Sequence, residues 1–590
     1  PSPSELNPEI PNTVSAIILK LLAKNAEDRY QSAYGLQMDL EECQRQWLAK
    51  NRIDEFEIGQ KDRNNQFQIP QKLYGREKDI EKMLAVFNSI MQGSSELLLI
   101  TGYTGIGKSA LAQEMYRPIT RTQGYFIVGK CDQYQRTQPY APLIQAFQLL
   151  IQQILAESPD RIAEWQSKIL SALGDKCQII IDVIPQLNLI LNQKTTNTEA
   201  EARNRFNVIF QKLVSVFASK DHPLVLFLDD LQWANVATLK LIKLLLTSEI
   251  KYLYIIAAYR SNEVDKTHPV SITVEQIQKT SKSIHTIQLN PLTLSEISQL
   301  LIDSLNESSV KISQLAWLLL EKTNGNPFFV NEFLKSIHSQ GLLVFSETNG
   351  TWEWEIKEIQ NRAITDNVVD LMIQKLQSLD KSTQKILQLA ACVGDPFDLE
   401  ILALIAQQEI QTTAAALHPA LTEGLIYPLK ESYKLLDVDL DEVINSLNIN
   451  YRFAHDQIQQ AAYSLADINE NSAIHYRIGQ LLLHHIPAEL REEYLFEIVN
   501  HLNLSQNLIQ SRLEKQKLVI LNLTAARKAR RSAAFQTALQ FLQVNLSLLD
   551  ADDWNQNYNF TLKSHIRAAE AAYLSGNFAE MRGLVEIVLE

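Results

Sequence analysis

The sequence predicts a multidomain protein with an α/β middle built on a parallel sheet and an all-helical C-terminal part. Its 590 residues are enough for three or four separate cores. Three continuous apolar runs, at 97–100, 224–228 and 252–258, are typical of strands buried on both faces of a parallel sheet. After residue 466 the apolar residues recur at helical spacing instead.

Composition and charge argue against several classes of protein. Hydrophobic residues make up 46% and charged residues 21% of the chain, as in globular proteins. No unbroken apolar stretch reaches the roughly 18 residues of a membrane span. The net charge of −13 disfavours a large nucleic-acid interface, and four scattered cysteines without CxxC spacing fit core thiols in a reducing cytoplasm. Because the opening PSPSELNPEIP has neither an initiator Met nor a signal peptide, we expect a fragment of a longer protein.

A glycine-rich stretch follows the first apolar run. Residues 102–109 read GYTGIGKS and match the pattern G-x-x-x-x-G-K-[ST] in full. Glycines let the backbone bend around an anion so that its N–H groups point at phosphates. We expect Lys108 to reach the β- and γ-phosphate oxygens, Ser109 to ligate Mg²⁺, and a helix to continue through Met115. The alternative is an ordinary glycine-rich turn. The predicted phosphate-binding residues are Gly102, Thr104, Gly105, Ile106, Gly107, Lys108, Ser109 and Ala110.

Charged residues close the other two apolar runs. Asp229 comes at the C-terminal end of the second run, at the edge of a parallel sheet where ligands bind. We expect Asp229 to hold Mg²⁺ through water and Asp230 to orient or polarise the attacking water. Arg260 follows the third run, where a guanidinium can sense a γ-phosphate. The alternatives are an acidic turn after a core strand and a surface arginine at a strand end.

With these motifs the middle of the chain, 72–290, resembles the STAND class of P-loop ATPases, which is related to AAA+ proteins and origin-recognition ATPases. The segments KLYGREKDIEKM and VGKCDQYQRTQPYAPLIQAF are similar to its first box and to its second strand and helix. DDLQWAN is similar to its acidic box, although relatives commonly have an acid where this chain has Asn235. The resemblance implies ATP or ADP with Mg²⁺ as ligands, and it implies that three residues lie near the adenine and ribose: Tyr74, Gly75 and Arg76.

Two further regions resemble parts of the same family. TNGNPFFVNEFL, in an expected helical lid at 291–362, looks like the glycine-x-proline motif, which implies that Pro327 packs on the adenine; a local turn that caps the helix from Phe328 is the alternative. Residues 363–465 resemble the winged-helix domain that follows the ATPase. There the resemblance implies that His455 contacts the β-phosphate of bound ADP in an off state, and a packed, satisfied histidine is the alternative. Winged helices also bind DNA, but the acidic charge balance favours a switching use.

The N-terminal region has a different sequence pattern. Residues 1–50 resemble the last two helices of a bacterial serine/threonine protein kinase C-lobe, with Arg29 at a position that pairs with an acid near the activation segment. An independent helical hairpin is the alternative. The sequence contains no HRD loop and no DFG, so this chain does not transfer phosphate to a protein by that route. The polar segment 51–71 is expected to be a linker.

The C-terminal region, 466–590, is expected to be a truncated helical-repeat array of the TPR-like kind. Phe535 and Phe578 are 43 residues apart, within the range of such repeats. Repeat arrays bind protein partners on their concave surface. A plain helical bundle is the alternative. We interpret one dense basic run as a solvated helix face: Arg527, Lys528, Arg530 and Arg531.

Three functions remain open at this point. The first is a nucleotide-dependent switch in signal transduction, with slow ATP hydrolysis to reset it. The second is a scaffold in which ATP is a structural ligand, and Asp230→Asn distinguishes the two because it should abolish only turnover. The third treats the chain as a regulatory segment of a larger hybrid serine/threonine protein kinase. Homo-oligomerisation is left open, and a DNA-handling ATPase is the least favoured function.

Overall fold

The structure, a computed structural model, describes residues 2–589 except for thirteen short segments: 24–28, 31–32, 60–66, 133–137, 193–205, 281–283, 347–350, 362–367, 430–448, 466–467, 487–490, 493 and 550–551. The chain divides into two compact units. Unit 1 contains residues 1–77 and 290–371, and unit 2 contains residues 78–289 and 372–590. Each unit has a hydrophobic core of its own.

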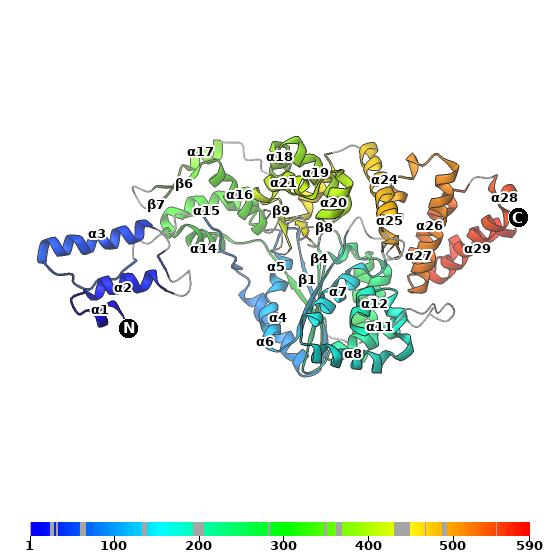
Figure 1. The fold of residues 1–590 in the computed structure, drawn as a ribbon, viewed down its shortest axis with the longest axis horizontal. Helices are drawn as coiled ribbons and strands as arrows, with labels where there is room; N and C mark the ends of the chain where they lie inside the picture. The colour runs from blue at the N-terminus through cyan, green and yellow to red at the C-terminus, as the bar shows by residue number, and fades with distance from the viewer. Residues whose placement is uncertain are drawn as a thin grey trace. The chain divides into compact units, whose positions relative to one another are not determined.

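A five-stranded parallel sheet is the centre of residues 78–289 in unit 2 (Figure 1). Its strand order is β2-β3-β4-β1-β5. Every residue of β1 is buried, as expected for a parallel strand that is covered on both faces. The sheet confirms the predicted α/β fold, with a strand at each of the three apolar runs. The strands are β1(Ser95–Gly102), β2(Tyr125–Lys130), β3(Leu224–Asp229), β4(Leu253–Arg260) and β5(Ile284–Gln288).

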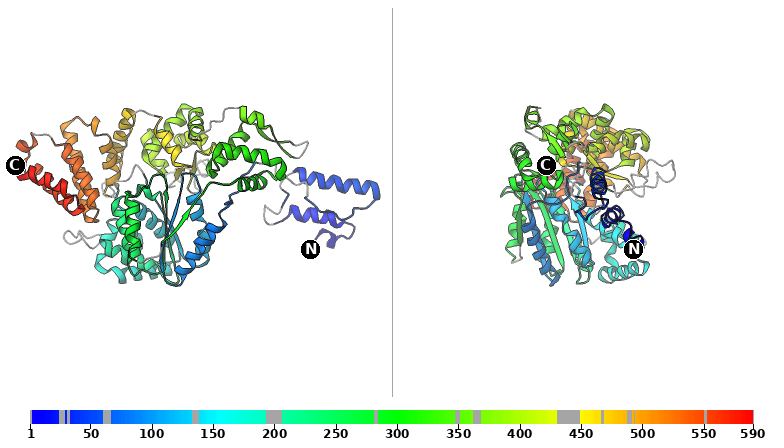
Figure 2. Two further views of the ribbon diagram at one scale, coloured as in Figure 1. Left: turned by 180° about the vertical axis from the view of Figure 1, so that it is seen from behind. Right: turned by 90° about the vertical axis from the view of Figure 1, so that its left-hand side faces the viewer.

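Helices cover both faces of this sheet (Figure 2). The longer ones present buried apolar residues at helical spacing, so that one side packs on the strands. They are α4(Glu77–Met91), α5(Lys108–Gln113), α6(Tyr116–Arg121), α7(Ala141–Leu155), α8(Pro159–Leu173), α9(Cys177–Ile181), α10(Asn188–Leu191), α11(Phe206–Phe217), α12(Val236–Thr247) and α13(Pro269–Gln278), with 3-10 turns η2(Gly174–Lys176), η3(Pro185–Leu187) and η5(Leu231–Trp233).

The helix after the glycine-rich stretch is shorter than predicted. α5 ends at Gln113 and α6 begins at Tyr116, so Met115 lies between two helices. The predicted helix through Met115 is therefore wrong in its length. Pro118 explains the break, because in a continuous helix its ring would clash with the carbonyl of Glu114 and it has no N–H to donate.

The next part of unit 2 combines helices with a small antiparallel sheet of order β8-β10-β9. Helices and short strands alternate here as the sequence predicts, and the winged-helix assignment stays a prediction. We call residues 372–465 the winged-helix-like part. Its elements are α18(Val368–Ser378), α19(Lys381–Val393), β8(Phe397–Asp398), α20(Leu399–Ala406), α21(Ile410–Thr422), β9(Ile426–Pro428), β10(Asn450–Phe453) and α23(Asp456–Tyr463).

The C-terminal part of unit 2 is all-helical in its described residues (Figure 1). Two long hairpins, α26 with α27 and α29 with α30, follow each other. Phe535 and Phe578 each begin the second helix of a hairpin, so the 43-residue spacing joins equivalent positions. The elements are α24(Ile468–His485), α25(Leu495–Leu504), η7(Gln506–Leu508), α26(Arg512–Arg531), α27(Phe535–Ser547), α28(Asp553–Gln556), α29(Tyr558–Ser575) and α30(Phe578–Leu589).

Unit 1 contains the N-terminal helices and the predicted lid. The lid is mainly helical, but it also has an antiparallel hairpin of β6 and β7 that the sequence analysis did not predict. Trp352 in β7 is fully buried in the core of this unit. The elements are α1(Pro3–Leu6), α2(Asn12–Leu21), α3(Ala33–Lys50), α14(Leu294–Leu305), α15(Ser309–Thr323), α16(Pro327–Ser339), β6(Leu343–Ser346), β7(Thr351–Trp354) and α17(Ile356–Asn361).

The segment expected to be a linker makes specific contacts within unit 1. The Gly59 amide donates to the buried carboxylate of Asp39 at 2.6 Å. Phe67 stacks on His338 of α16 with ring centroids 4.7 Å apart. The described residues of 51–71 therefore make specific contacts near both ends, and the linker assignment stays a prediction.

Two expectations from composition can be compared with the structure. All four cysteines, which lie within the described residues, are buried and free. Within the described ranges, no helix combines the length and the apolar character needed to cross a bilayer.

Candidate nucleotide-binding site

The glycine-rich loop joins β1 to α5. Gly105 and Gly107 have φ values of +73° and +98°, which glycine adopts without strain. Gly107 is the N-cap of α5, and no atom lies within 4 Å of where a Cβ would be, so its backbone faces open space. At Gly107 the loop therefore presents its backbone to open space, as a phosphate cradle requires.

Lys108 begins α5 and folds back over the loop. Its Nζ donates to the carbonyl oxygens of Gly102, at 3.2 Å, and Tyr103, at 2.9 Å. Burial lowers the pKa of Lys108, while the carboxylates of Asp229 and Asp230 oppose that shift. The cation is thus held at the mouth of the loop by carbonyl groups that a phosphate oxygen can replace.

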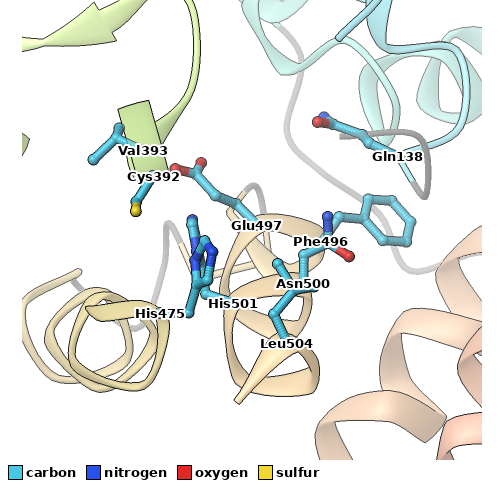
Figure 3. A pocket seen from close by; sticks show the side chains of 9 residues that line it. All are labelled: Gln138, Cys392, Val393, His475, Phe496, Glu497, Asn500, His501 and Leu504. Atoms are coloured by element: carbon cyan, nitrogen blue, oxygen red, sulfur yellow. The ribbon is translucent and has the colours of Figure 1, made fainter. Parts of the chain in front are cut away.

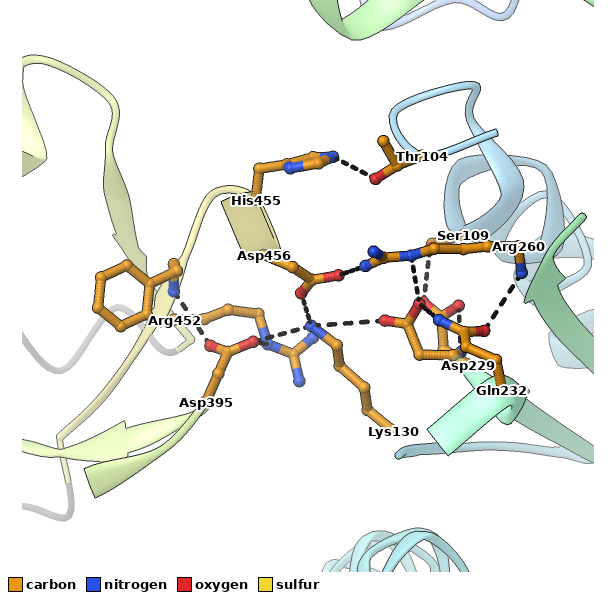
Figure 4. Close-up of polar contacts among 12 residues, drawn as sticks. Thr104, Ser109, Lys130, Asp229, Gln232, Arg260, Asp395, Arg452, His455 and Asp456 are labelled. Carbon is orange, nitrogen blue, oxygen red and sulfur yellow. Dashed lines mark hydrogen bonds and ion pairs between the residues drawn. The ribbon is translucent and has the colours of Figure 1, made fainter. Parts of the chain in front are cut away.

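The two predicted Mg²⁺ ligands lie side by side. Ser109 Oγ donates to Asp229 Oδ2 at 2.5 Å (Figure 4). Ser109 lies in α5, which follows β1, and Asp229 ends β3; in the sheet β4 lies between β1 and β3. A hydroxyl and a carboxylate at one sheet edge are oxygen donors of the kind that Mg²⁺ prefers, so the residues present fit this ion.

Asp230 lies next to Asp229 in a left-handed backbone conformation, with φ +52°. Its buried carboxylate accepts from Gln232 Nε2 at 2.9 Å and lies 3.5 Å from Arg260 Nε. Burial, together with the negative charges of Asp229 and Asp456, raises the pKa of Asp230 to about 8. This carboxyl therefore keeps its proton to a higher pH than an ordinary aspartate does.

Arg260 ends β4 and is not a surface residue. Its side chain is only 11% exposed and stacks on Trp233, 4.6 Å from the ring centroid. Nη1 pairs with Glu263 at 2.8 Å, and Nη2 pairs with Asp456 at 2.5 Å. The alternative of a surface arginine is therefore wrong, because the guanidinium is engaged by a residue of the winged-helix-like part.

His455 precedes α23 and lies on the glycine-rich loop. Its Nδ1 accepts from the Gln457 amide, at 3.2 Å, which leaves the proton on Nε2. Nε2 then donates to Thr104 Oγ1, 3.3 Å away (Figure 4). Burial lowers the pKa of His455 to about 4, so the ring is neutral near pH 7. His455 is thus a buried histidine whose two ring nitrogens both have partners, and its contact with a β-phosphate stays a prediction.

Lys130, Asp395 and Asp456 complete the site, and the sequence analysis missed all three. Lys130 Nζ lies 2.5 Å from Asp456 and 2.9 Å from Asp395 (Figure 4). It also lies 3.9 Å from Asp230. Burial alone would lower the pKa of Lys130, but these three carboxylates together raise it. Asp395 also accepts from the Phe453 amide at 3.1 Å and lies 3.7 Å from Arg452 Nε. The sequence did contain a signal for Lys130, since it is the last residue of β2 and so lies at the edge of the sheet where ligands bind.

The remaining predicted residues of this loop and box have structural contacts. Ile106 is buried and Ala110 is exposed. Asn235 caps α12 by accepting from the Thr238 amide at 2.9 Å, and its side-chain amide donates to the Gln138 carbonyl at 2.8 Å. The amide at this position therefore has a role in the fold that an acid would not reproduce.

The residues expected near the adenine lie in unit 1. Tyr74 donates to Asp303 Oδ2 at 2.9 Å, and Arg76 donates to the Asn290 carbonyl at 2.7 Å. Gly75 has φ +67°, and a Cβ there would come within 2.0 Å of Glu296. Pro327 is the first residue of α16, where Asn326 caps the Phe328 amide at 3.1 Å. The local cap is present, and the adenine contacts stay predictions.

A second cluster of titratable side chains lines a cavity of about 20 Å³ in unit 2 (Figure 3). His475 and His501 share a hydrogen bond of 2.9 Å between their Nδ1 atoms. Burial raises the pKa of Glu497 to about 7 and lowers the pKa of His475 to about 4. No group of three or more metal-binding side chains occurs in the part of the chain that the structure describes. The cavity is lined by Gln138, Cys392, Val393, His475, Phe496, Glu497, Asn500, His501 and Leu504.

Residues 72–256 match the family described as "AAA ATPase domain". The matched segment contains the glycine-rich loop, Lys130 and the acidic box, and it stops just before the end of β4. This match makes the segment an AAA-type P-loop ATPase domain and confirms the class that the motifs predicted.

The chain also resembles longer signalling proteins. It is 28% identical, over 99% of its own length, to the hybrid signal transduction histidine kinase G of Dictyostelium discoideum. It is 21% identical, over 72% of its length, to the peroxide stress-activated histidine kinase mak3 of Schizosaccharomyces pombe. The chain spans about a fifth of the length of each of these relatives, 21% and 22% respectively.

Two solved structures resemble the chain more distantly. One is a signal transduction ATPase with numerous domains and a tetratricopeptide repeat sensor from Pyrococcus horikoshii, with 13% identity, a TM-score of 0.38, and coverage of 89% of this chain and 65% of that one. The other is the ORC2 protein of Aeropyrum pernix, with 13% identity, a TM-score of 0.31, and coverage of 68% and 95%. Both scores are too low to establish a shared fold.

Proposed function

We propose that this chain is a nucleotide-dependent switch in signal transduction, in which ATP at the glycine-rich loop controls the contact between the ATPase core and the winged-helix-like part. One observation carries the proposal. Arg260, the candidate γ-phosphate sensor, is paired with Asp456 of the winged-helix-like part rather than left open to a ligand. A ligand that competes for Arg260 must therefore weaken this contact.

The loop and the acidic box supply the groups that bind ATP with Mg²⁺. Lys108 would hold β- and γ-phosphate oxygens, while Ser109 and Asp229 would hold the ion. When bound, Mg²⁺ neutralises phosphate charge and thereby favours transfer of the terminal phosphoryl group. Asp230, which lies beside Asp229 in the acidic box, would orient the attacking water.

The histidine supplies a second link between nucleotide and switch. His455 donates to Thr104 within the loop, so its neutral ring lies beside the expected phosphate position. In the proposed off state ADP occupies the loop and His455 and Asp456 keep the winged-helix-like part on the core. In the on state the γ-phosphate engages Arg260, and the C-terminal helices change what they contact.

The test is to identify nucleotide that copurifies with the protein and to measure ATP and ADP affinity. The switch predicts bound ADP in the wild-type chain and loss of both affinities in Lys108→Ala. A wild-type chain with no affinity for either nucleotide overturns the proposal. Asp230→Asn then separates the switch from a scaffold: the switch predicts lost hydrolysis with retained ATP binding, whereas a scaffold predicts no measurable hydrolysis even in the wild type.

We also propose that the chain is a regulatory part of a larger kinase in the cytoplasm. This rests on the short share of its relatives that the chain spans and on their names, which specify histidine kinases. The resemblance of residues 1–50 to a serine/threonine kinase C-lobe instead suggests that second kinase class. Assay of the complete parent protein for phosphohistidine and for phosphoserine decides between them. The helical hairpins are the proposed surface for protein partners or a second copy of the chain.

A further inference from the structure

Lys130 is a strongly paired cation of the site, and the proposed switch gives it no role. Its side chain is 14% exposed and its ammonium lies between three carboxylates. The two nearest, Asp456 and Asp395, belong to the winged-helix-like part, whereas Asp230 of the core is 3.9 Å away. The charge of Lys130 is therefore neutralised mainly across the contact that the switch opens.

The sheet places Lys130 at the phosphate edge. In the parallel pairing of β2 with β3, Lys130 is the register partner of Asp229. Asp229 in turn accepts from Ser109, the first hydroxyl after the loop lysine. Lys130 and Arg260 thus approach the acidic box from the two strands that flank β3.

The charged groups between the ATPase core and the winged-helix-like part suggest an anionic ligand. The winged-helix-like part contributes two carboxylates, Asp395 and Asp456, and one guanidinium, Arg452, which amounts to one excess negative charge. His455 is neutral and adds nothing. When this part withdraws, Lys130 loses its two nearest anions and keeps only Asp230, 3.9 Å away, whereas Arg260 keeps Glu263. A nucleoside triphosphate differs from a diphosphate by one more anionic phosphoryl group, which would give Lys130 a new partner.

We propose that Lys130 determines the preference for a triphosphate over a diphosphate by binding the γ-phosphoryl group together with Arg260 after Asp395 and Asp456 withdraw. In the structure the two aspartates occupy Lys130 in place of that group. The inference rests on the proposed function, because it assigns a residue to the same ligand. It differs from a purely structural role, in which Lys130 would only hold the winged-helix-like part in place.

The experiment removes the competing aspartates before it tests the lysine. In the chain carrying Asp395→Asn and Asp456→Asn, the affinities for ADP and for a non-hydrolysable ATP analogue with Mg²⁺ are measured by titration calorimetry, with and without Lys130→Met. We expect the added Lys130→Met to weaken binding of the ATP analogue by roughly tenfold while ADP binding is unchanged, since one charge-assisted contact to the third phosphate is lost. Lys130→Arg, which keeps the charge, is expected to retain the preference.

The controls separate the possible outcomes. Lys243→Met removes a cation from the exposed face of α12, where Nζ contacts only Gln276, and is expected to change neither affinity. Retained ADP binding in each variant shows that it is folded. Equal effects of Lys130→Met on both nucleotides, or no effect, overturn the role of Lys130 and leave the switch intact. If the wild-type chain binds no nucleotide, the proposed function fails and this inference fails with it.

Discussion

Asp456 is the shared hydrogen-bond acceptor of two cations of the ATPase core, Lys130 and Arg260. One oxygen accepts from Lys130 and the other from Arg260, both at 2.5 Å. Burial would raise the pKa of Asp456, but Lys130, His455 and Arg260 hold it well below its usual range. The carboxylate therefore stays charged throughout the physiological pH range, and only a competing anion or a mutation releases its partners.

Asp456→Asn should accelerate the release of bound ADP. The substitution leaves two buried cations without their shared partner, so the closed arrangement loses stability. We expect roughly a tenfold faster release of fluorescent ADP in stopped-flow experiments, because truncating a buried ion pair acts mainly on dissociation. Asp265→Asn, in the exposed turn after β4, is the control and should leave the rate unchanged. Equal rates in Asp456→Asn and wild type would contradict the prediction.

Glu497→Gln should stabilise the protein on the alkaline side. The pKa of Glu497 is raised from 4.5 to about 7, so the folded chain holds this proton more tightly than the unfolded chain does. Stability therefore falls as the pH rises from about 4.5 to about 7 and stays reduced above it. The variant escapes this loss, and its free energy of unfolding should exceed that of the wild type by on the order of 2 kcal/mol at pH 8. Urea unfolding at pH 5 and pH 8 measures this. A difference independent of pH would refute the prediction.

At the scale of elements, the sequence predicted those strands whose own residues form a clear local pattern. The three continuous apolar runs are central strands of the sheet. Such strands are buried on both faces, so their sequences are apolar throughout and can be recognised directly. β5 escaped prediction since it is an edge strand that pairs only with β1, and its IHTIQ sequence has just one fully buried position. The β6–β7 hairpin was missed because each of its strands has only four residues. It buries Trp352 in the core of unit 1, whose other residues come from other parts of the chain.

Some residues of the candidate site could be predicted from local sequence patterns and others could not. Lys108, Ser109 and the acidic box follow from short motifs, and the structure brings Ser109 and Asp229 together. The partners of Lys130 lie 265 and 326 residues further along the chain, so no local pattern joins them. Contacts at that separation depend on how two folded parts meet, which a single sequence does not report.

Gly129→Ala tests how closely α7 packs on β2. A Cβ at this position would lie 1.8 Å from the Pro142 carbonyl oxygen, so strand and helix would have to separate. We expect a loss of about 1–3 kcal/mol in the free energy of unfolding, as for other overpacked sites. Gly583→Ala is the control: it lies within α30, has open space around the new Cβ, and should be neutral or slightly stabilising. Equal stability of the two variants would contradict this packing argument.

At the scale of unit 2, the C-terminal helices pack on the ATPase core. Residues of α26, α27 and α29 belong to the same hydrophobic core as the parallel sheet. The buried hydroxyl of Tyr140, just before α7, donates to the Ser532 carbonyl at 2.7 Å. Nearby, the Asn235 amide donates to the Gln138 carbonyl. A short path of contacts thus leads from the end of the acidic box to the turn between α26 and α27.

Tyr140→Phe should weaken this junction. The substitution keeps the ring but leaves the Ser532 carbonyl without the hydroxyl donor, which costs about 1–2 kcal/mol at a buried site. Thermal unfolding should show a lower midpoint for the variant. Tyr116→Phe is the control, because that side chain is 58% exposed and its hydroxyl makes no hydrogen bond with the described residues. An unchanged midpoint in Tyr140→Phe would show that the hydroxyl does not hold the helices to the core.

The register of β2 against β3 also limits which length changes this chain can tolerate. Side chains of neighbouring rungs alternate between the two faces of a sheet, so a single-residue deletion within β2 would turn Lys130 to the opposite face and bring Cys131 into its rung. An uncharged thiol would then meet the aspartates. Natural length variation is therefore expected in the loops before and after this strand, while the strand itself keeps a constant number of residues.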